Sequence, residues 1–362
     1  MLREIGSNFW FSPEETKGSS ILPSPSTFGC EGSDYVWMST GRSATRLVLE
    51  TIIERNPTLT RKALIPSFTC HTVIEPFIEF GFEVIPLPIN EELKTSPNEI
   101  ISLQRQTNAS VVLAHHYFGF ITTPHLMGVI EELNNQGVIL IEDRTQCLYS
   151  SFPLSSADYY VGSIRKWCGV PDGGFAVCRE GTFRNKPTQT DELMVSIKKE
   201  ASELKYRFIY NGEGEKSVYK KMYSEAEALL DSQDQFYSIG KLSCIIQAGL
   251  DIDELKTKRR KNFSRLMVGI KDIHKIKPVF DSLPEGVTPL YFPVLLEDRK
   301  SFQSQLAEND VYAPVVWPKA ECCPPVSKEA DYIYKHILCI PIDQRYGIDD
   351  MEHIISVINN EC

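Results

Sequence analysis

The sequence predicts an α/β fold with a mostly parallel central sheet flanked by helices and a smaller C-terminal α+β domain. From about residue 39 onward, apolar strand-like runs alternate with helix-like segments, and such alternation is typical of parallel βαβ units. The run Val138 to Ile141 contains only apolar residues and leads directly into Glu142 and Asp143. A continuous apolar run of this kind is expected of a strand that is buried on both faces of a parallel sheet.

The chain of 362 residues is long enough for more than one domain. Residues 1–36 are rich in Ser, Pro and Gly, which predicts an N-terminal arm with little regular structure, packed on a partner subunit or tied down elsewhere. An α/β domain is expected over residues 37–240. It includes a charged, helix-prone insertion at about 188–235 that either covers a site or bridges to the C-terminal domain at 241–362.

Individual elements follow from the pattern of apolar residues. In the first domain we expect strands at 63–66, 83–87, 110–114 and 138–141, and helices at 72–80 and about 124–135. In the C-terminal domain we expect one long helix from 242 to about 270, strands at 288–296 and 311–317, and a closing helix at 349–358.

Composition excludes several classes of function. The formal net charge is −10, with acidic and basic residues mixed along the chain, which argues against a nucleic-acid-binding surface. The densest basic run, residues 256–261, is most simply the solvated face of a helix. No apolar stretch reaches 18 residues and no apolar leader core opens the chain, so we expect no membrane partner.

The ten cysteines are scattered and include no C-x-x-C pair, which favours free thiols in a reducing, cytoplasmic compartment over a disulfide framework or a zinc site. His115 and His116 are the most tempting metal pair. Adjacent residues on a strand point to opposite faces, so no metal site is predicted.

The first candidate catalytic residue is Lys166. It follows a strand-like run that ends near Gly162 and Ser163, and it precedes the turn formed by Gly173 and Gly174. A lysine amine becomes a nucleophile when desolvation or nearby positive charge lowers its pKa. A well-known use of such an amine is a Schiff base with pyridoxal 5'-phosphate (PLP). Taken alone, the lysine is most simply a solvated surface charge.

Two further features complete a pattern. Asp143 lies at the carboxyl end of its predicted strand, where ligands of parallel sheets bind; it suits either a pyridinium nitrogen or a helix N-cap. Gly41, Arg42 and Ser43 precede a helix-like segment, and a helix N-terminus binds phosphate readily. In chain order, these features give a phosphate site, a carboxylate for the cofactor ring and a Schiff-base lysine.

These segments resemble the DegT/DnrJ/EryC1/StrS family of PLP-dependent sugar aminotransferases, which have the fold-type I aspartate aminotransferase architecture. The resemblance covers the chain from Gly41 to the last helix, and the order and spacing of its motifs are more specific than any single motif. The matching segments are residues 41–44, 66–69, 116–119, 142–146, 163–174 and 337–351.

The resemblance implies roles for individual residues. Lys166 would carry the cofactor and Asp143 would pair with its ring nitrogen, while Gln146 would bond near the ring hydroxyl. Ser163, Gly41 and the amides of Arg42 and Ser43 would hold the phosphate, and His116 would border the cofactor pocket.

The chain also departs from the family's pattern. Cys70 occupies the position where an aromatic residue usually stacks on the cofactor ring, so that Cys70, His71 or another side chain covers the ring. Arg144 replaces a small residue beside Asp143, and Pro171 and Asp172 replace a Gly-Glu pair. The family's segment that reaches a neighbouring subunit's phosphate is hard to find around Phe236 to Gly240.

The resemblance implies a cytoplasmic, homodimeric aminotransferase. It would transfer an amino group from a donor such as glutamate to a keto-sugar, which we expect to be nucleotide-linked, as in polysaccharide biosynthesis. Two alternatives remain open at this stage. A sugar dehydratase of the same family would have histidine in place of Lys166, and a PLP-binding regulatory or non-catalytic homologue would keep the fold without turnover.

Overall fold

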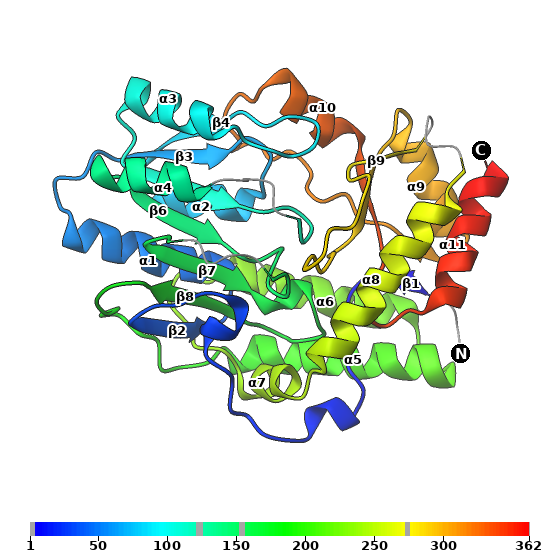
Figure 1. Ribbon diagram of the computed structural model, residues 1–362. Coiled ribbons are helices and arrows are strands. Elements are labelled where there is room, and N and C mark those ends of the chain that lie inside the picture. Colours follow the sequence, from blue (N-terminus) through cyan, green and yellow to red (C-terminus); the bar gives the residue numbers. More distant parts are fainter. Residues whose placement is uncertain (1–3, 121–125, 152–155, 272–275, 362) are drawn as a thin grey trace.

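The computed structural model describes residues 4–120, 126–151, 156–271 and 276–361. Its centre is a seven-stranded sheet with the order β2-β8-β7-β6-β5-β3-β4 (Figure 1). The strands are β2 (Asp34–Met38), β3 (Lys62–Pro66), β4 (Glu83–Leu87), β5 (Val111–His115), β6 (Ile139–Asp143), β7 (Tyr159–Ser163) and β8 (Gly174–Cys178). Neighbouring strands pair in parallel, except that β8 is antiparallel to both β2 and β7. The predicted fold class, α/β with a mostly parallel sheet, is confirmed.

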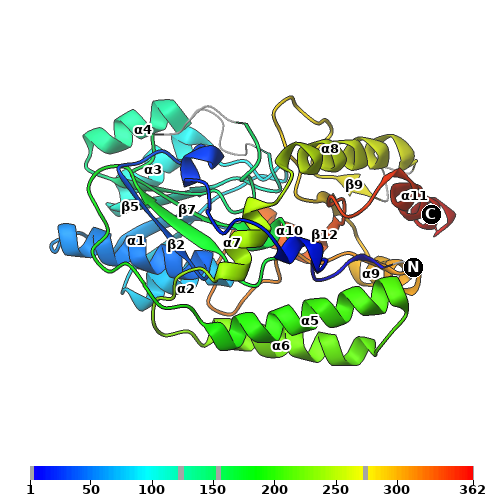
Figure 2. The same ribbon diagram turned by 90° about the horizontal axis from the view of Figure 1, so that it is seen from below.

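Helices cover both faces of this sheet (Figure 2). On one face lie α1 (Gly41–Arg55) and α2 (His71–Glu79), and on the other lie α3 (Pro97–Thr107) and α4 (Leu126–Asn135). Each helix buries an apolar stripe against the strands, as Leu47 and Val48 of α1 do in the core that also contains Ile65 and Val161. Residues 124 and 125 of the helix predicted at about 124–135 lie outside the described residues.

The described part of the N-terminal arm is held by its own chain. It contains β1 (Ile5–Gly6) and two short 3₁₀ helices, η1 (Glu14–Thr16) and η2 (Pro25–Phe28). β1 pairs in parallel with β11 (Val311–Tyr312), and Phe11 and Phe28 are buried in the core of the large sheet. Burial of these apolar residues explains why a segment so poor in regular structure is ordered.

The predicted insertion contains two helices, α5 (Glu192–Asn211) and α6 (Lys216–Asp231), which run antiparallel along one side of the molecule (Figure 2). Gly212 ends α5 with a φ of +71°, a left-handed conformation that glycine adopts without steric cost. The turn that follows reverses the chain and brings the end of α6 toward the large sheet.

The C-terminal part combines a three-stranded antiparallel sheet with five helices among its described residues. Its elements are α7 (Lys241–Ala248), α8 (Ile252–Gly269), β9 (Lys277–Pro278), β10 (Phe292–Leu295), α9 (Arg299–Glu308), α10 (Lys328–His336), β12 (Ile337–Ile340) and α11 (Ile348–Glu361), and the sheet order is β12-β10-β9. Its core joins α8, α11 and both sheet faces through residues such as Phe263, Phe292 and Ile354.

Three expectations for this part were wrong in detail. The single helix predicted from residue 242 is two helices, because α7 ends at Gly249 and Asp251 caps α8 by accepting a hydrogen bond from the Glu254 amide at 2.8 Å. The predicted strands at 288–296 and 311–317 are shorter than expected. β10 covers only Phe292–Leu295, and β11 covers only Val311–Tyr312.

The basic run at 256–261 is only partly solvated. Lys261 is exposed, whereas Arg259 is fully buried and donates to the carbonyl oxygen of Leu290 at 2.9 Å and to Gln344 Oε1 at 2.9 Å. Its guanidinium also lies over the Trp167 ring at 4.8 Å. Backbone carbonyls thus compensate a buried charge that the sequence pattern assigned to solvent.

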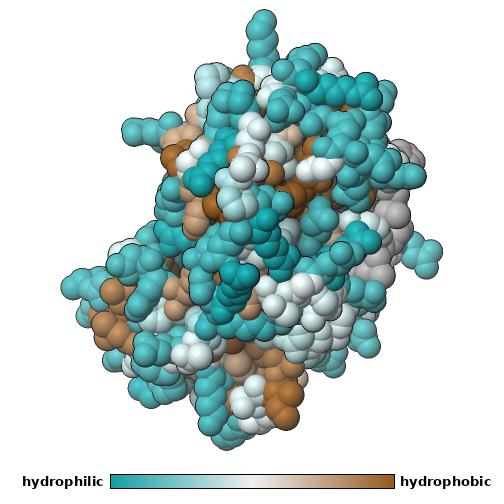
Figure 3. Space-filling view, turned by 90° about the vertical axis from the view of Figure 1, so that its left-hand side faces the viewer, coloured by the Kyte–Doolittle hydropathy of each residue, from teal (hydrophilic) through white to brown (hydrophobic). Residues whose placement is uncertain are grey.

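The surface in Figure 3 is largely hydrophilic, with hydrophobic residues in separate patches. None of the helices in the described part of the chain is long and apolar enough to cross a membrane. The nine cysteines within the described ranges are free thiols.

Candidate active site

The carboxyl ends of the parallel strands surround a cavity of about 270 Å³. Nine of the ten candidate residues line it: Gly41, Arg42, Cys70, His71, His116, Asp143, Gln146, Ser163 and Lys166. They come from the segments that follow β2, β3, β5, β6 and β7, so the sheet gathers residues that are up to 125 positions apart (41 to 166). This is the position at which open parallel sheets bind ligands.

Ser43 is the candidate that does not line the cavity. It is buried, and its amide donates to Thr40 Oγ1 at 3.0 Å, so that Thr40 is the N-cap of α1. The first N–H groups of a helix lack an acceptor within the helix. The amides of Gly41 and Arg42 therefore remain as the anion-binding end of α1, with Thr40 beside them at the cavity.

The glycines after Lys166 let the lysine loop approach α1. A Cβ atom on Gly174 would lie 2.3 Å from the carbonyl oxygen of Thr40, and Gly173 has a φ of +136°, which side chains rarely tolerate. Ser163 Oγ donates to the carbonyl oxygen of Gly173 at 3.1 Å. A Cβ on Gly41 would lie 3.4 Å from Ser163 Cβ, so Ser163 adjoins the N-terminus of α1.

Lys166 ends the short 3₁₀ helix η3 (Ile164–Lys166) that follows β7. Its amine makes no hydrogen bond or ion pair with any described residue, and its side chain also lines two adjoining cavities. Lys166 is exposed through these cavities. Desolvation of the amine by the surrounding protein, and secondarily the charge of Arg165, lowers the pKa of Lys166. A neutral amine in this position is a nucleophile.

Asp143 faces the same cavity from the end of β6. Its Oδ1 accepts a hydrogen bond from the Thr145 amide at 2.8 Å, and burial raises its pKa. Gln146, one turn later, accepts from the Phe118 amide through Oε1 at 2.9 Å. That bond fixes the side-chain amide of Gln146 at the cavity wall.

Cys70 and His71 lie on the wall formed by the start of α2. Thr72 Oγ1 donates to Cys70 Sγ at 3.1 Å, and His71 Nδ1 lies 3.8 Å from the same sulfur. Burial raises the pKa of Cys70, but the hydrogen bonds from His71 and Thr72 outweigh burial and leave that pKa lowered. The Cys70 thiol is therefore a polar wall group rather than an aromatic platform.

Aromatic side chains enter the cavity from other segments. Trp317, from the C-terminal part, lines the cavity and stacks on His115 with ring centroids 6.0 Å apart. Burial lowers the pKa of His115 to about 3, with His116 contributing, so the His115 ring is neutral. The sequence pattern gave His115 no role except as half of a discarded metal pair.

His116 and Arg144 form a buried network behind the cavity. His116 Nε2 lies 3.4 Å from Glu142 Oε1, and Arg144 Nη1 donates to the same oxygen at 3.0 Å. Arg144 Nη2 also donates to the Phe28 carbonyl at 3.1 Å. Arg144 does not line the cavity, because neighbouring residues of an extended segment point in alternate directions. Its expected influence on the pocket beside Asp143 is therefore indirect.

The sequence pattern did not predict the cavity wall that α6 forms. Glu227, Leu230 and Asp231 of α6 line the cavity together with Arg165. Arg165 Nη2 donates to Glu227 at 2.5 and 2.7 Å, and Lys198 of α5 pairs with Glu227 at 2.5 Å. Of the two roles considered for the insertion, the structure shows α6 at the cavity wall.

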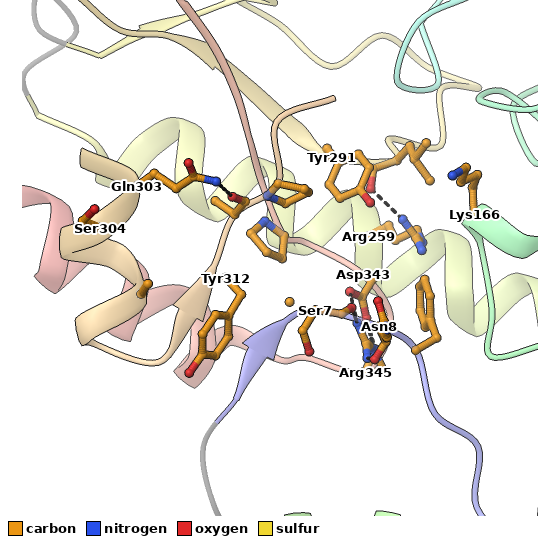
Figure 4. A pocket seen from close by; sticks show the side chains of 17 residues that line it. Ser7, Asn8, Lys166, Arg259, Tyr291, Gln303, Ser304, Tyr312, Asp343 and Arg345 are labelled. Carbon is orange, nitrogen blue, oxygen red and sulfur yellow. Dashed lines mark hydrogen bonds and ion pairs between the residues drawn. The ribbon is translucent and has the colours of Figure 1, made fainter. Parts of the chain in front are cut away.

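A second cavity of about 480 Å³ extends from Lys166 toward the C-terminal elements. Figure 4 shows Lys166 at one edge, with Gln303, Ser304 and Tyr312 on the far side and Asp343 paired with Arg345 below. The N-terminal arm contributes Ser7 and Asn8 to the same wall. Most of these polar groups are uncharged hydroxyls and amides.

No protein-family model matches the chain, and no curated protein sequence matches it significantly. Solved structures do match. A DegT DnrJ EryC1 StrS aminotransferase from Brucella abortus is 16% identical, with a TM-score of 0.65 over 98% of this chain and 91% of that one. PseC of Helicobacter pylori, an aminotransferase involved in the biosynthesis of pseudoaminic acid, is 12% identical, with a TM-score of 0.70 over 99% of both chains.

DesI, solved in the presence of its TDP-sugar product, is 12% identical, with a TM-score of 0.69 over 99% of this chain and 93% of that one. The similarity in each case covers nearly the whole of both chains. The chain therefore has the fold of DegT/DnrJ/EryC1/StrS-type sugar aminotransferases.

Proposed function

We propose that this protein is a PLP-dependent aminotransferase that transfers an amino group from an amino-acid donor such as glutamate to a nucleotide-linked keto-sugar. The observation that carries the proposal is the position of Lys166. Its unpaired amine lies where the cavity lined by Asp143 and the start of α1 meets a second, polar cavity.

The residues of the first cavity fit the cofactor. The amides of Gly41 and Arg42, with Ser163 beside them, would hold the phosphate. Asp143 would face the ring nitrogen, and Gln146 would lie near the ring hydroxyl. Bound there, PLP supplies an electron sink for amino-group chemistry.

Lys166 would perform the proton transfers. Desolvation lowers the pKa of its amine, which favours the neutral form that would accept the α-proton of the donor and return it to the neighbouring carbon. Asp143 would remain ionised opposite a protonated ring, because an adjacent cation favours a carboxylate. Cys70, His71 and His116 would limit access of water from the remaining walls.

The second cavity is where we place the amino acceptor. Ser7, Asn8, Gln303 and Ser304 offer hydroxyl and amide groups that suit sugar hydroxyls, and Tyr312 offers an aromatic face. The TDP-sugar product present with DesI supports a nucleotide-linked acceptor. A homodimeric state, a cytoplasmic location, and the absence of nucleic-acid and membrane partners stay predictions.

The test begins with the absorbance spectrum of the protein mixed with PLP. Covalent binding should produce a visible band, and titration with a series of amino acids should bleach it when half-transamination occurs. Borohydride reduction and peptide mapping should then place the label on Lys166. Lys198 is the internal control, because burial and then Arg165 also lower its pKa, to about 7. A label on Lys198 or on any other lysine would contradict the assignment.

The same titration separates the alternatives. A visible band that no amino donor bleaches would identify a PLP-binding regulatory or non-catalytic homologue. Loss of a sugar hydroxyl without consumption of a donor would identify a dehydratase, which the presence of Lys166 disfavours.

A further inference from the structure

Two arginines lie at the end of the cavity where Gly41 and Ser163 meet. Arg42 pairs with Asp231 of α6 at 2.8 Å and with Glu75 at 3.5 Å. Arg165 pairs with Glu227 of α6 at 2.5 Å. Both arginines and both carboxylates of α6 line the cavity.

One face of α6 serves both arginines. Glu227 and Asp231 are four residues apart on α6, so they project from the same side of the helix. Arg42 directly follows Gly41, and Arg165 is two residues after Ser163. Since Gly41 and Ser163 are neighbours, both arginines belong to the part of the cavity where the phosphate is expected.

Arg165 has hydrogen-bonding capacity that the described residues do not use. Its Nη2 donates to Glu227, whereas its Nε is buried and has no hydrogen-bond partner among them. A guanidinium carries more N–H donors than one carboxylate needs. A buried donor without a partner on a charged group destabilises the folded protein. Here the donor is Nε of Arg165, and Arg165 lines the cavity.

Arg165 shares its carboxylate partner with a second cation, since Lys198 of α5 also pairs with Glu227 at 2.5 Å. Glu227 faces Arg165 and Lys198, and despite burial these two cations hold the pKa of Glu227 well below its usual range. Burial and Arg165 lower the pKa of Lys198 to about 7. Both pKa values are lowered because the positive charge of Arg165 favours the ionised form of Glu227 and disfavours the protonated form of Lys198, whose burial acts in the same direction.

We propose that Arg165, together with Arg42, binds the phosphate of the cofactor while Glu227 and Asp231 of α6 hold the two guanidinium groups in place. This inference rests on the proposed PLP-dependent function. It assigns to the insertion a role as the support of a phosphate site that the chain builds from its own arginines.

The test compares the affinity for PLP with the affinity for pyridoxal, which lacks the phosphate. Dissociation constants are measured from the visible absorbance of protein with Lys166 intact. Arg165→Gln should weaken PLP binding by about 10- to 100-fold, as expected for the loss of a charge-assisted hydrogen bond, and should leave pyridoxal binding nearly unchanged. Arg42→Gln should act in the same direction with a smaller change, because its donors already have partners.

Arg46→Gln is the matched control. Arg46 lies one turn after Arg42 on α1 and pairs with Glu79 at 2.6 Å, but it does not line the cavity. Its loss should change neither affinity. Arg165→Lys, which keeps the charge without the planar fork, should recover part of the PLP affinity, and circular dichroism should show all variants folded.

The outcomes are separable. If Arg165→Gln weakens PLP and pyridoxal equally, or changes neither, the phosphate assignment is overturned while PLP dependence stands. If it weakens only a phosphorylated acceptor, the arginine serves the substrate and the assignment is also overturned. Wild-type protein that binds neither aldehyde would overturn the proposed function and this inference together.

Discussion

Asp172 gives the sharpest prediction of pH-dependent stability. It lies in the loop between Lys166 and Gly173 and is fully buried. Its Oδ2 accepts a hydrogen bond from the Gly240 amide at 2.9 Å, and the Ser243 hydroxyl donates to its Oδ1. These bonds fasten the lysine loop to the start of α7. Replacing Asp172 with Asn removes the ionisation while keeping the shape of the side chain.

The magnitude follows from the pKa. Burial raises the pKa of Asp172 from 3.8 to about 6, although hydrogen bonds from Ser243 and Gly240 and the charges of Arg165 and Lys198 oppose the rise. The folded state therefore binds this proton more tightly than the unfolded state does. Its contribution to stability is fully present below about pH 4 and is lost as the pH rises through 6. Two pKa units correspond to about 3 kcal/mol.

The assay is urea unfolding of wild type and Asp172→Asn between pH 4 and pH 7.5. The free energy of unfolding of the variant, relative to wild type, should rise by about 2.5 kcal/mol over this range, because a small part of the contribution is already lost at pH 4. Glu213→Gln, on the exposed turn between α5 and α6, controls for removal of a carboxylate. A relative stability that is independent of pH, or that falls as the pH rises, would refute the reasoning.

Three further predictions concern the site and the assembly. Asp143→Asn should fold and bind PLP, but its half-reaction with a donor should slow by about two to three orders of magnitude, because a buried ion pair with the ring is lost. Stopped-flow absorbance measures this rate, and a rate near that of wild type would mean that Asp143 acts only as a helix cap. Cys70→Ala should leave PLP affinity nearly unchanged and Cys70→Tyr should tighten it or block the ring, since an aromatic stack contributes about 0.5–1.5 kcal/mol; a large loss in Cys70→Ala would show that the thiol contacts the ring. Sedimentation at micromolar concentration should show a homodimer, which needs an interface of roughly 2,000 Å², and an active monomer would rule this out.

The sequence by itself determined the fold class and most of the cavity. Apolar runs such as Val138 to Ile141 report strands directly, because a strand buried on both faces has no polar position. Asp143, Ser163 and Lys166 follow such strands closely, and parallel strands end at one edge of their sheet. Local pattern is therefore enough to bring these residues together.

Local pattern also misled where proline, glycine and caps interrupt it. The break between α7 and α8 depends on the single cap at Asp251, which an averaged helical period does not detect. Ser43 looked like a phosphate ligand because it lies in the first turn of α1, but Thr40 takes its amide. Competition between neighbouring donors and acceptors decides such cases.

Only the tertiary structure decided which distant residues complete the site. Arg165, Glu227 and Asp231 carry no motif, and Trp317 is 151 positions beyond Lys166 (317 minus 166), yet all four line the cavity. Their positions depend on how the α5–α6 hairpin and the C-terminal part pack against the sheet. Charge pairing and burial between segments far apart in the chain leave no periodic pattern in either segment. The sequence therefore determined the residues at the strand ends, and only the packing determined which residues of α6 and the C-terminal part complete the cavity.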